Sequence, residues 1–237
     1  MYEEKILVTS NDVDNHFETK VSALFRYMQQ VATNHSEILG IGKSATSDQG
    51  MIWVITRFKV IIHKYPVLNE TITVKTDPYN RMMFIFPRSF HIYNEAGELL
   101  VSALSSWVVI GLRDRKIIVN PFPELKIDES DIIKDVSTPE KVNAFDLNFV
   151  EERKVRFNDI DLNGHLNNTK YIDYLIDIHD SSFYDQYKLK TITINYEKEI
   201  KDKDIVKLYS NNQIDELIKG EVNSETCFAA HLEFIKR

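Results

Sequence analysis

A dense group of polar residues lies directly ahead of an amphipathic segment in the second half of the chain. The stretch from Asn158 to Asn168 combines carboxylates and amides with one histidine, His165. Such groups within a few residues of one another can activate a water molecule, orient it and transfer protons. Backbone amides at the start of the following helix can stabilise negative charge on a substrate carbonyl oxygen. We therefore treat this stretch as the candidate catalytic loop.

Two other interpretations of the loop compete with the catalytic one. The run from Asp159 to Gly164 matches the opening of an EF-hand calcium loop. The twelfth position of such a loop requires a bidentate glutamate and here holds Lys170, so calcium binding is disfavoured. The second alternative is purely structural, because aspartate and asparagine favour turns and helix N-caps. Asn167 or Asn168 is a candidate N-cap under this interpretation.

Helical and strand-like patterns place the loop in a larger arrangement. Apolar residues recur at spacings of three and four between Val21 and Leu39, and Gly40 ends the predicted helix. A shorter amphipathic helix follows Asn168. A long helix followed by antiparallel strands predicts an α+β fold in which a curved sheet wraps around the helix. In the first half of the chain, strands are expected over residues 51–62, 70–76, 82–93 and 99–112.

The second half of the chain repeats features of the first half. The run Asn11–Asp14 has the same pattern as Asn158–Asp161, and at the same offset Tyr27 aligns with Tyr174 in a second amphipathic helix. We interpret this similarity as an internal duplication. A proline-containing, acidic stretch between the copies is typical of a surface linker. The predicted organisation is an N-terminal domain over residues 1–119, a linker over 120–149 and a C-terminal domain over 150–237.

The polar pattern of the loop carries a resemblance to a known class of enzymes. It resembles the signature of hotdog-fold thioesterases, in the form Asp161-x-Asn163-x-His165-x-Asn167-Asn168. The whole chain is similar to the acyl-acyl carrier protein thioesterases of plants and bacteria, and Tyr196-x-x-Glu199 matches a second motif of that family. The resemblance implies a double hotdog, which is two tandem hotdog domains that each wrap a curved antiparallel sheet around a long helix.

The resemblance also implies a role for each matching residue. Glu199 would be the general base that activates water or, alternatively, a nucleophilic carboxylate, and Asp161 would hold the loop. Asn163 and His165 would orient the water or polarise the thioester. Plant members often have a cysteine after the glutamate, but this chain has Ile200, which excludes a thiol nucleophile at that position. The residues carried over as candidate substrate-binding groups are Asn167 and Asn168.

The first copy lacks the implied catalytic set. At the same offset, Asn163–His165 corresponds to His16–Glu18. An ungapped alignment of the following strands places Ile61 opposite Glu199. We therefore expect a degenerate site in the first domain, which in the resembled family also contributes to the acyl pocket.

The implied reaction is hydrolysis of a fatty acyl thioester on acyl carrier protein, which releases free fatty acid and the carrier thiol in fatty acid biosynthesis. No metal or cofactor is expected, because the phosphopantetheine arm belongs to the substrate. The alternatives are an acyl-CoA thioesterase with the same site and a non-catalytic acyl-binding hotdog protein. A homodimer is compatible with this organisation and stays open.

Composition excludes several other classes of protein. The chain has 237 residues and a net charge of −7, which argues against a nucleic-acid partner. No apolar run is long enough to span a membrane. The single cysteine, Cys227, excludes an internal disulfide and is expected in the core. Because the first residues are neither basic nor apolar, we expect a cytoplasmic protein.

Overall fold

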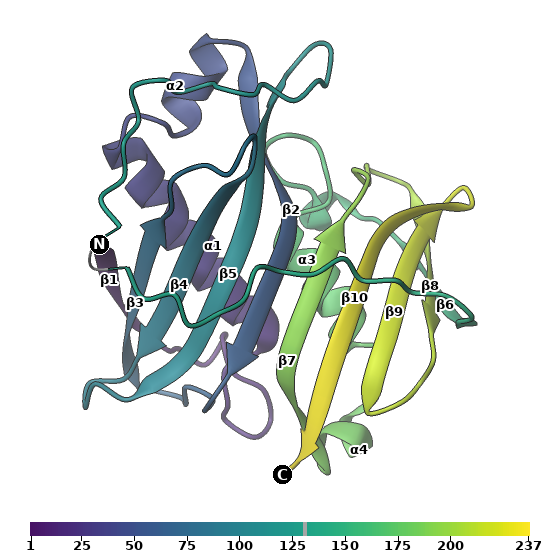
Figure 1. Ribbon diagram of the computed structural model, residues 1–237. Coiled ribbons are helices and arrows are strands. Elements are labelled where there is room, and N and C mark those ends of the chain that lie inside the picture. The colour runs from purple at the N-terminus through teal and green to yellow at the C-terminus, as the bar shows by residue number, and fades with distance from the viewer. Residues whose placement is uncertain (130–131) are drawn as a thin grey trace. The chain divides into compact units, whose positions relative to one another are not determined.

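Two structural units make up the chain in the computed structural model, which describes residues 1–129 and 132–237. The first unit spans Met1–Pro139 and the second spans Glu140–Arg237, and each is described by itself (Figure 1). Residues 130 and 131 belong to the predicted linker and lie outside the described residues. The predicted boundaries of the linker, at residues 120 and 149, stay a prediction.

The first unit packs a long helix against an antiparallel sheet (Figure 1). Its elements are β1 (Tyr2–Leu7), α1 (Val21–Ile38), α2 (Lys43–Asp48), β2 (Met51–Ile62), β3 (Thr71–Pro78), β4 (Phe86–Tyr93) and β5 (Leu99–Gly111). The strands follow one another across the sheet in the order β1-β3-β4-β5-β2. All neighbouring strands in this order are antiparallel.

Helix α1 forms because one of its faces is apolar and can be buried against the sheet. Leu24 and Met28, one turn apart, are fully buried. The ring of Phe25 lies 4.8 Å from the ring of Phe58 on β2, measured between centroids. Gly40 takes a φ of +68° just after the helix, a left-handed conformation that ends it as predicted.

The strands predicted for the first unit are found close to their expected ranges except at the start of β4, whereas β1 was not predicted. Residues 82–93 were expected to form one strand, but β4 begins at Phe86. Met82 and Ile85 exchange backbone hydrogen bonds of 2.8 and 3.0 Å, and Met83 takes a φ of +58°. These contacts close a tight turn, which cannot continue the extended backbone of a strand. The predicted strand is therefore too long at its N-terminal end.

The second unit repeats the combination of a helix and an antiparallel sheet. Its elements are β6 (Asn148–Lys154), the 3-10 helix η1 (Phe157–Asp159), α3 (Asn168–Ile176), α4 (Ser181–Tyr184), β7 (Tyr187–Tyr196), β8 (Ile205–Ser210), β9 (Asp215–Val222) and β10 (Glu225–Lys236). The strands follow one another in the order β7-β10-β9-β8-β6, with every neighbouring pair antiparallel.

Aromatic contacts fix helix α3 on this second sheet. The Tyr171 ring lies 5.2 Å from the ring of Tyr196 on β7 and 5.1 Å from that of Phe228 on β10. Ile172 and Leu175 are fully buried beside them. Since burial of such side chains is the main source of stability in a small domain, α3 is a rigid support for the loop that precedes it.

The segment that leads into β6 is fastened to the face of the sheet opposite α3. Tyr196 contacts the helix, so its neighbour Asn195 points to the other face. The Asn195 side chain accepts a hydrogen bond from the Val142 amide at 2.7 Å and donates one to the Glu140 carbonyl at 3.1 Å.

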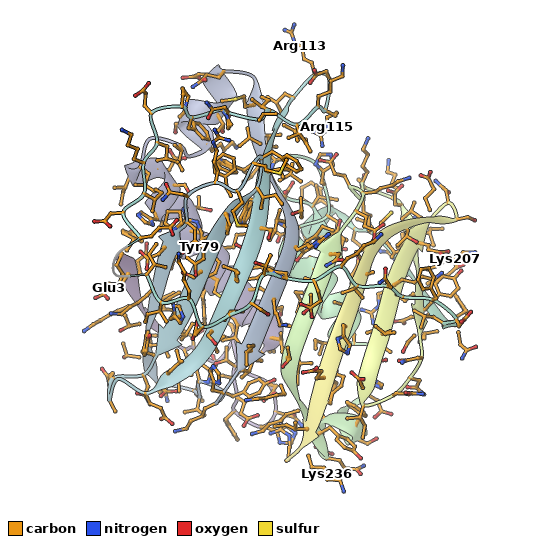
Figure 2. The ribbon with its side chains drawn as sticks, in the orientation of Figure 1. Glu3, Tyr79, Arg113, Arg115, Lys207 and Lys236 are labelled. Atoms are coloured by element: carbon orange, nitrogen blue, oxygen red, sulfur yellow. The ribbon has the colours of Figure 1, made fainter. Side chains whose placement is uncertain are left out.

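The charged side chains of Arg113 and Arg115 extend from the turn after β5 (Figure 2). Among the described residues, no helix has the length and hydropathy needed to cross a membrane.

Candidate active site

Hydrogen bonds to a single carboxylate shape the candidate catalytic loop. Oδ1 of Asp161 accepts the backbone amides of Asn163 at 2.8 Å and of His165 at 3.2 Å. The Asp161 amide donates to the His165 carbonyl at 2.8 Å. Gly164 has a φ of +81°, which an L side chain adopts only with strain. Asp161 therefore holds the loop, in the position that the sequence predicts for it.

Backbone pairing brings this loop against the segment that follows β7. The Leu166 amide donates to the Ile200 carbonyl at 2.8 Å, and His165 forms an isolated bridge with Lys201. As a result, Nε2 of His165 lies 3.1 Å from Oε2 of Glu199. The two side chains are 21% and 32% exposed, so water and a substrate can reach both of them. The structure thus brings together two predicted site residues that are far apart in the sequence.

The side chain of Asn163 is exposed and contacts Asp161. Its Nδ2 is 3.4 Å from Oδ2 of Asp161, and the residue is exposed. The side-chain amide of Asn163 thus contacts Asp161, whereas the imidazole of His165 contacts Glu199. Asn163 can still turn its amide toward a bound substrate, because the side chain is exposed.

Asn167 caps helix α3, which is the structural role that the sequence also allowed. Its Oδ1 accepts hydrogen bonds from the Thr169 amide at 3.0 Å and the Thr169 hydroxyl at 2.9 Å. Its carbonyl accepts the Lys170 amide at 2.8 Å. Asn168 is the first residue of the helix. Substrate binding by Asn167 and Asn168 stays a prediction.

Burial keeps two tyrosine hydroxyls and one thiol near the loop in their neutral forms. It is the main cause of a raised pKa for the Tyr171 hydroxyl, the Tyr196 hydroxyl and the Cys227 thiol. Cys227 is 3% exposed, and its carbonyl accepts the amides of Glu197 and Lys198. A protonated, buried thiol is a poor nucleophile. Cys227 is a core residue, as predicted.

The first unit contains a loop of the same geometry. Oδ1 of Asp14 accepts the amides of His16 at 2.8 Å and of Glu18 at 3.2 Å, the pattern that Asp161 makes in the second unit. Phe17 occupies the position of Gly164 and also has a positive φ, of 61°. These matching bonds support the internal duplication inferred from the sequence.

The first loop also shows which residue stands in the place of Glu199. The Thr19 amide donates to the Pro66 carbonyl at 2.8 Å, as the Leu166 amide donates to the Ile200 carbonyl. The residue before Pro66 is Tyr65, so Tyr65 is the counterpart of Glu199 and the predicted counterpart Ile61 is wrong. The predicted alignment placed Phe58 opposite Tyr196, but the residue opposite Tyr196 is Ile62, where β2 ends as β7 ends at Tyr196.

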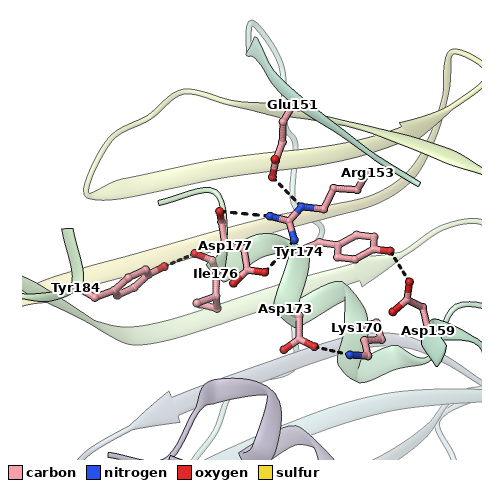
Figure 3. Close-up of polar contacts among 9 residues, drawn as sticks. All are labelled: Glu151, Arg153, Asp159, Lys170, Asp173, Tyr174, Ile176, Asp177 and Tyr184. Atoms are coloured by element: carbon pink, nitrogen blue, oxygen red, sulfur yellow. Dashed lines mark hydrogen bonds and ion pairs between the residues drawn. The ribbon is translucent and has the colours of Figure 1, made fainter. Parts of the chain in front are cut away.

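An open pocket on the second unit lies beside the loop. Its volume is about 390 Å³, and both acidic and basic side chains surround it (Figure 3). Neither His165 nor Glu199 lines it. The sequence analysis did not predict this pocket. One of its lining residues, Tyr174, was noted only because it aligns with Tyr27 in the first copy. The lining residues are Arg153, Lys154, Asp159, Lys170, Asp173, Tyr174 and Asp177.

Within the described ranges, one group of side chains has the geometry to share a metal ion. Asp215, His231 and Glu233 place ligand atoms within 4.8 Å of one another on β9 and β10. Both carboxylates are exposed, and His231 is hydrogen-bonded to Asp215. None of the predicted catalytic residues belongs to this group. That the candidate site works without a metal or cofactor stays a prediction.

Comparison with known protein families covers nearly the whole chain. Residues 1–121 match the family model for the acyl-ACP thioesterase N-terminal domain, and residues 142–233 match that for the acyl-ACP thioesterase C-terminal domain. A chloroplastic palmitoyl-acyl carrier protein thioesterase of Gossypium hirsutum is 25% identical over 84% of this chain and 52% of its own length. A chloroplastic dodecanoyl-[acyl-carrier-protein] hydrolase of Cinnamomum camphora is 26% identical over 84% of this chain and 56% of its own length. The chain thus spans a little over half the length of these curated relatives.

Solved structures show the same fold. An acyl-ACP thioesterase from Bacteroides thetaiotaomicron superposes with a TM-score of 0.91 at 20% identity, covering 98% of this chain and 97% of that chain. The 12:0-ACP thioesterase from Umbellularia californica gives a TM-score of 0.80 at 20% identity, covering 100% of this chain and 97% of that chain. These likenesses confirm the predicted α+β double hotdog fold.

Proposed function

Because this chain belongs to the acyl-ACP thioesterase family, we propose that it hydrolyses fatty acyl thioesters of acyl carrier protein in fatty acid biosynthesis. The products are a free fatty acid and the carrier thiol. The observation that carries this proposal is the contact of 3.1 Å between Nε2 of His165 and Oε2 of Glu199. A carboxylate and an imidazole at this distance form an acid–base pair that water can reach.

In the proposed mechanism, Glu199 is the general base. Its carboxylate removes a proton from a water molecule, and the resulting oxygen nucleophile attacks the thioester carbonyl carbon. The carbon–sulfur bond then breaks, and the proton that Glu199 removed passes to Nε2 of His165 and on to the leaving thiolate, which returns both side chains to their starting forms. An imidazole suits this step, because its ordinary pKa of about 6.5 lets it exchange protons near neutral pH.

The negative charge that develops on the carbonyl oxygen needs a hydrogen-bond donor. The first amides of α3 are poorly placed for this role, because Asn167 already accepts the amides of Thr169 and Lys170. We assign the role to the side-chain amide of Asn163, which is exposed and is held only by a contact of 3.4 Å to Asp161. Asp161 then acts by holding the loop.

The substrate supplies the rest of the chemistry. The phosphopantetheine arm arrives with the carrier protein, so we propose a reaction without a metal ion or dissociable cofactor. The first unit carries Tyr65 and Glu18 where the second has Glu199 and His165. We therefore propose that the first unit is not catalytic and that, as the resemblance implies, it contributes to the acyl pocket.

Thiol release from a panel of acyl carrier protein and CoA thioesters, C8 to C18, tests the proposed function. Glu199→Gln and His165→Ala should each lower the rate by about 10²-fold or more, because each removes one acid–base group. Glu197→Gln is the matched control, since it changes an exposed glutamate two residues away and should leave the rate unchanged.

The panel also separates this proposal from its alternatives. Faster turnover of CoA thioesters would keep the chemistry and change the leaving group. If no thioester is hydrolysed, the proposed function fails. If Glu199→Gln is as active as the wild-type protein, the assignment of Glu199 as the general base fails. Binding of acyl chains without hydrolysis would instead support a non-catalytic acyl-binding protein.

A further inference from the structure

One aspartate closes the candidate catalytic loop at both ends. Oδ2 of Asp159 accepts the Arg156 amide at 2.9 Å, and its carbonyl accepts the Asn167 amide at 2.8 Å. The stretch between these two bonds carries Asp161, Asn163 and His165. The position of Asp159 therefore sets the position of the whole loop.

A tyrosine of α3 ties this aspartate to the helix. The Tyr174 hydroxyl donates a hydrogen bond of 3.4 Å to Oδ2 of Asp159 (Figure 3). The tyrosine is 6% exposed, and the guanidinium of Arg153 lies 5.4 Å from the centre of its ring. Arg153 is itself held by Glu151 at 2.8 Å and Asp177 at 2.9 Å. We call Arg153, Tyr174 and Asp159 the loop anchor.

The hydroxyl of Tyr174 stays a hydrogen-bond donor at neutral pH. Burial and the negative charge of Asp159 raise the pKa of Tyr174 to about 12. Within the anchor, the neutral hydroxyl of Tyr174 donates to the carboxylate of Asp159. Arg153 belongs to β6 and connects this pair to an edge strand of the sheet.

The first unit has an aspartate in the same position, with similar neighbours. Asp12 accepts the Thr9 amide at 3.0 Å with its side chain and the Lys20 amide at 2.8 Å with its carbonyl, as Asp159 does. Arg26 forms an ion pair with Asp12 and lies 5.6 Å from the centre of the Tyr27 ring. The hydroxyl of Tyr27, the counterpart of Tyr174, is buried, and burial together with the neighbouring Asp12 raises the pKa of Tyr27. An arginine, a tyrosine and an aspartate thus lie together in both copies, but the copy with this group beside Glu199 and His165 is the second.

We propose that the loop anchor is a positioning device for catalysis, in which Tyr174 and Arg153 act through Asp159 to keep His165 and Asn163 in reach of the substrate beside Glu199. This inference rests on the proposed function. A contact such as the 3.1 Å between His165 and Glu199 is lost after a small shift of the loop, and misplacement by about 1 Å can cost about 10²-fold in rate. The anchor borders an open pocket where water competes for the same groups, so its contribution to stability is small.

The decisive variant is Tyr174→Phe, which keeps the ring under Arg153 and removes only the hydroxyl. We expect kcat to fall by about 10-fold or more with little change in KM, because the acyl chain and carrier still bind. Tyr27→Phe is the matched control in the first unit and should leave kcat unchanged. Asp159→Asn should reproduce the loss of kcat, since it removes the charge on Oδ2, which accepts from both the Arg156 amide and the Tyr174 hydroxyl.

Hydrogen–deuterium exchange supplies a readout that does not depend on activity. Exchange of the amides in residues 156–167 should become faster in Tyr174→Phe, while residues 9–20 should be unaffected. Unchanged kcat together with unchanged exchange would overturn the anchor, as would equal losses of kcat in Tyr174→Phe and Tyr27→Phe. If the wild-type protein hydrolyses no thioester, the proposed function fails on its own, and exchange still decides whether Tyr174 holds the loop.

Discussion

Gly164 is the residue on which the turn of the candidate loop depends. Its φ is +81°, and nothing lies within 4 Å of the position that a Cβ would take. Gly164→Ala therefore introduces backbone strain without a clash, at a cost of about 1 kcal/mol. We expect a loss of kcat as well, because the amides of Asn163 and His165 that flank Gly164 are both held by Asp161.

Gly97 provides the matched control for this substitution. It has a φ of +79° in the turn between β4 and β5, and a Cβ there would also meet nothing within 4 Å. Gly97→Ala should lower the midpoint of thermal unfolding by a similar amount and leave kcat unchanged. Equal kcat values for the two variants would show that the shape of the Asp161 turn does not matter for the reaction.

The site residues show what a sequence can reveal at this scale. The types and spacing of Asp161, Asn163 and His165 were visible, because they are close together in one loop. The pairing of His165 with Glu199 could be expected only from a resemblance, since it depends on a backbone bridge between His165 and Lys201. The sequence allowed both a cap and a substrate-binding role for Asn167, because both roles require the same residue type, and the structure shows the cap.

At the scale of elements, helix α1 carries a titratable group that links the stability of the first unit to pH. Nδ1 of His35 accepts a hydrogen bond of 3.2 Å from Arg88 on β4, which requires a neutral imidazole. Burial and the positive charge of Arg88 lower the pKa of His35 to about 4. Its pKa in the unfolded chain is about 6.5. Between these two values the unfolded state binds a proton that the folded state does not, so stability falls as the pH falls.

We therefore expect the free energy of unfolding to decrease by about 2 kcal/mol between pH 7.5 and pH 5 on account of His35. Urea denaturation at both pH values measures this difference. In His35→Gln the side chain can still accept from Arg88 but cannot be protonated, so most of the decrease should vanish. A variant with the same pH dependence as the wild-type protein would contradict this assignment.

The elements also show where prediction from the sequence stops. The helix at residues 21–39 and most strands of the first unit followed from periodicity, which reflects burial of one face. The start of β4 did not, because a turn closed by Met82 and Ile85 interrupts an apolar run. Likewise, Tyr65 rather than Ile61 is the counterpart of Glu199, because similar apolar runs can be aligned in more than one register and the hydrogen bonds show which register holds.

At the scale of the whole molecule, two copies of one loop geometry have diverged in chemistry. Asp14 and Asp161 hold their turns with the same pattern of amides, and Asp12 and Asp159 close both loops in the same way. The shared geometry shows that these aspartates shape the loop in both copies. The copies differ in their chemical groups, because Tyr65 stands in the place of Glu199 and Glu18 in the place of His165. A duplicated chain can thus keep two folded units while only one of them retains an acid–base pair.

This divergence predicts one catalytic centre in each chain. Glu199→Gln slows hydrolysis, so this variant can hold the thioester that the wild-type protein hydrolyses fastest. Isothermal titration of the variant with that substrate should give about one bound thioester per chain, a ratio that does not depend on whether the chain forms a homodimer. The reason is that the first unit offers Tyr65 and Glu18, which cannot form the carboxylate–imidazole pair seen at 3.1 Å in the second unit. Two bound thioesters per chain, or residual hydrolysis in Glu199→Gln that Glu18→Gln abolishes, would show that the first copy has kept a working site.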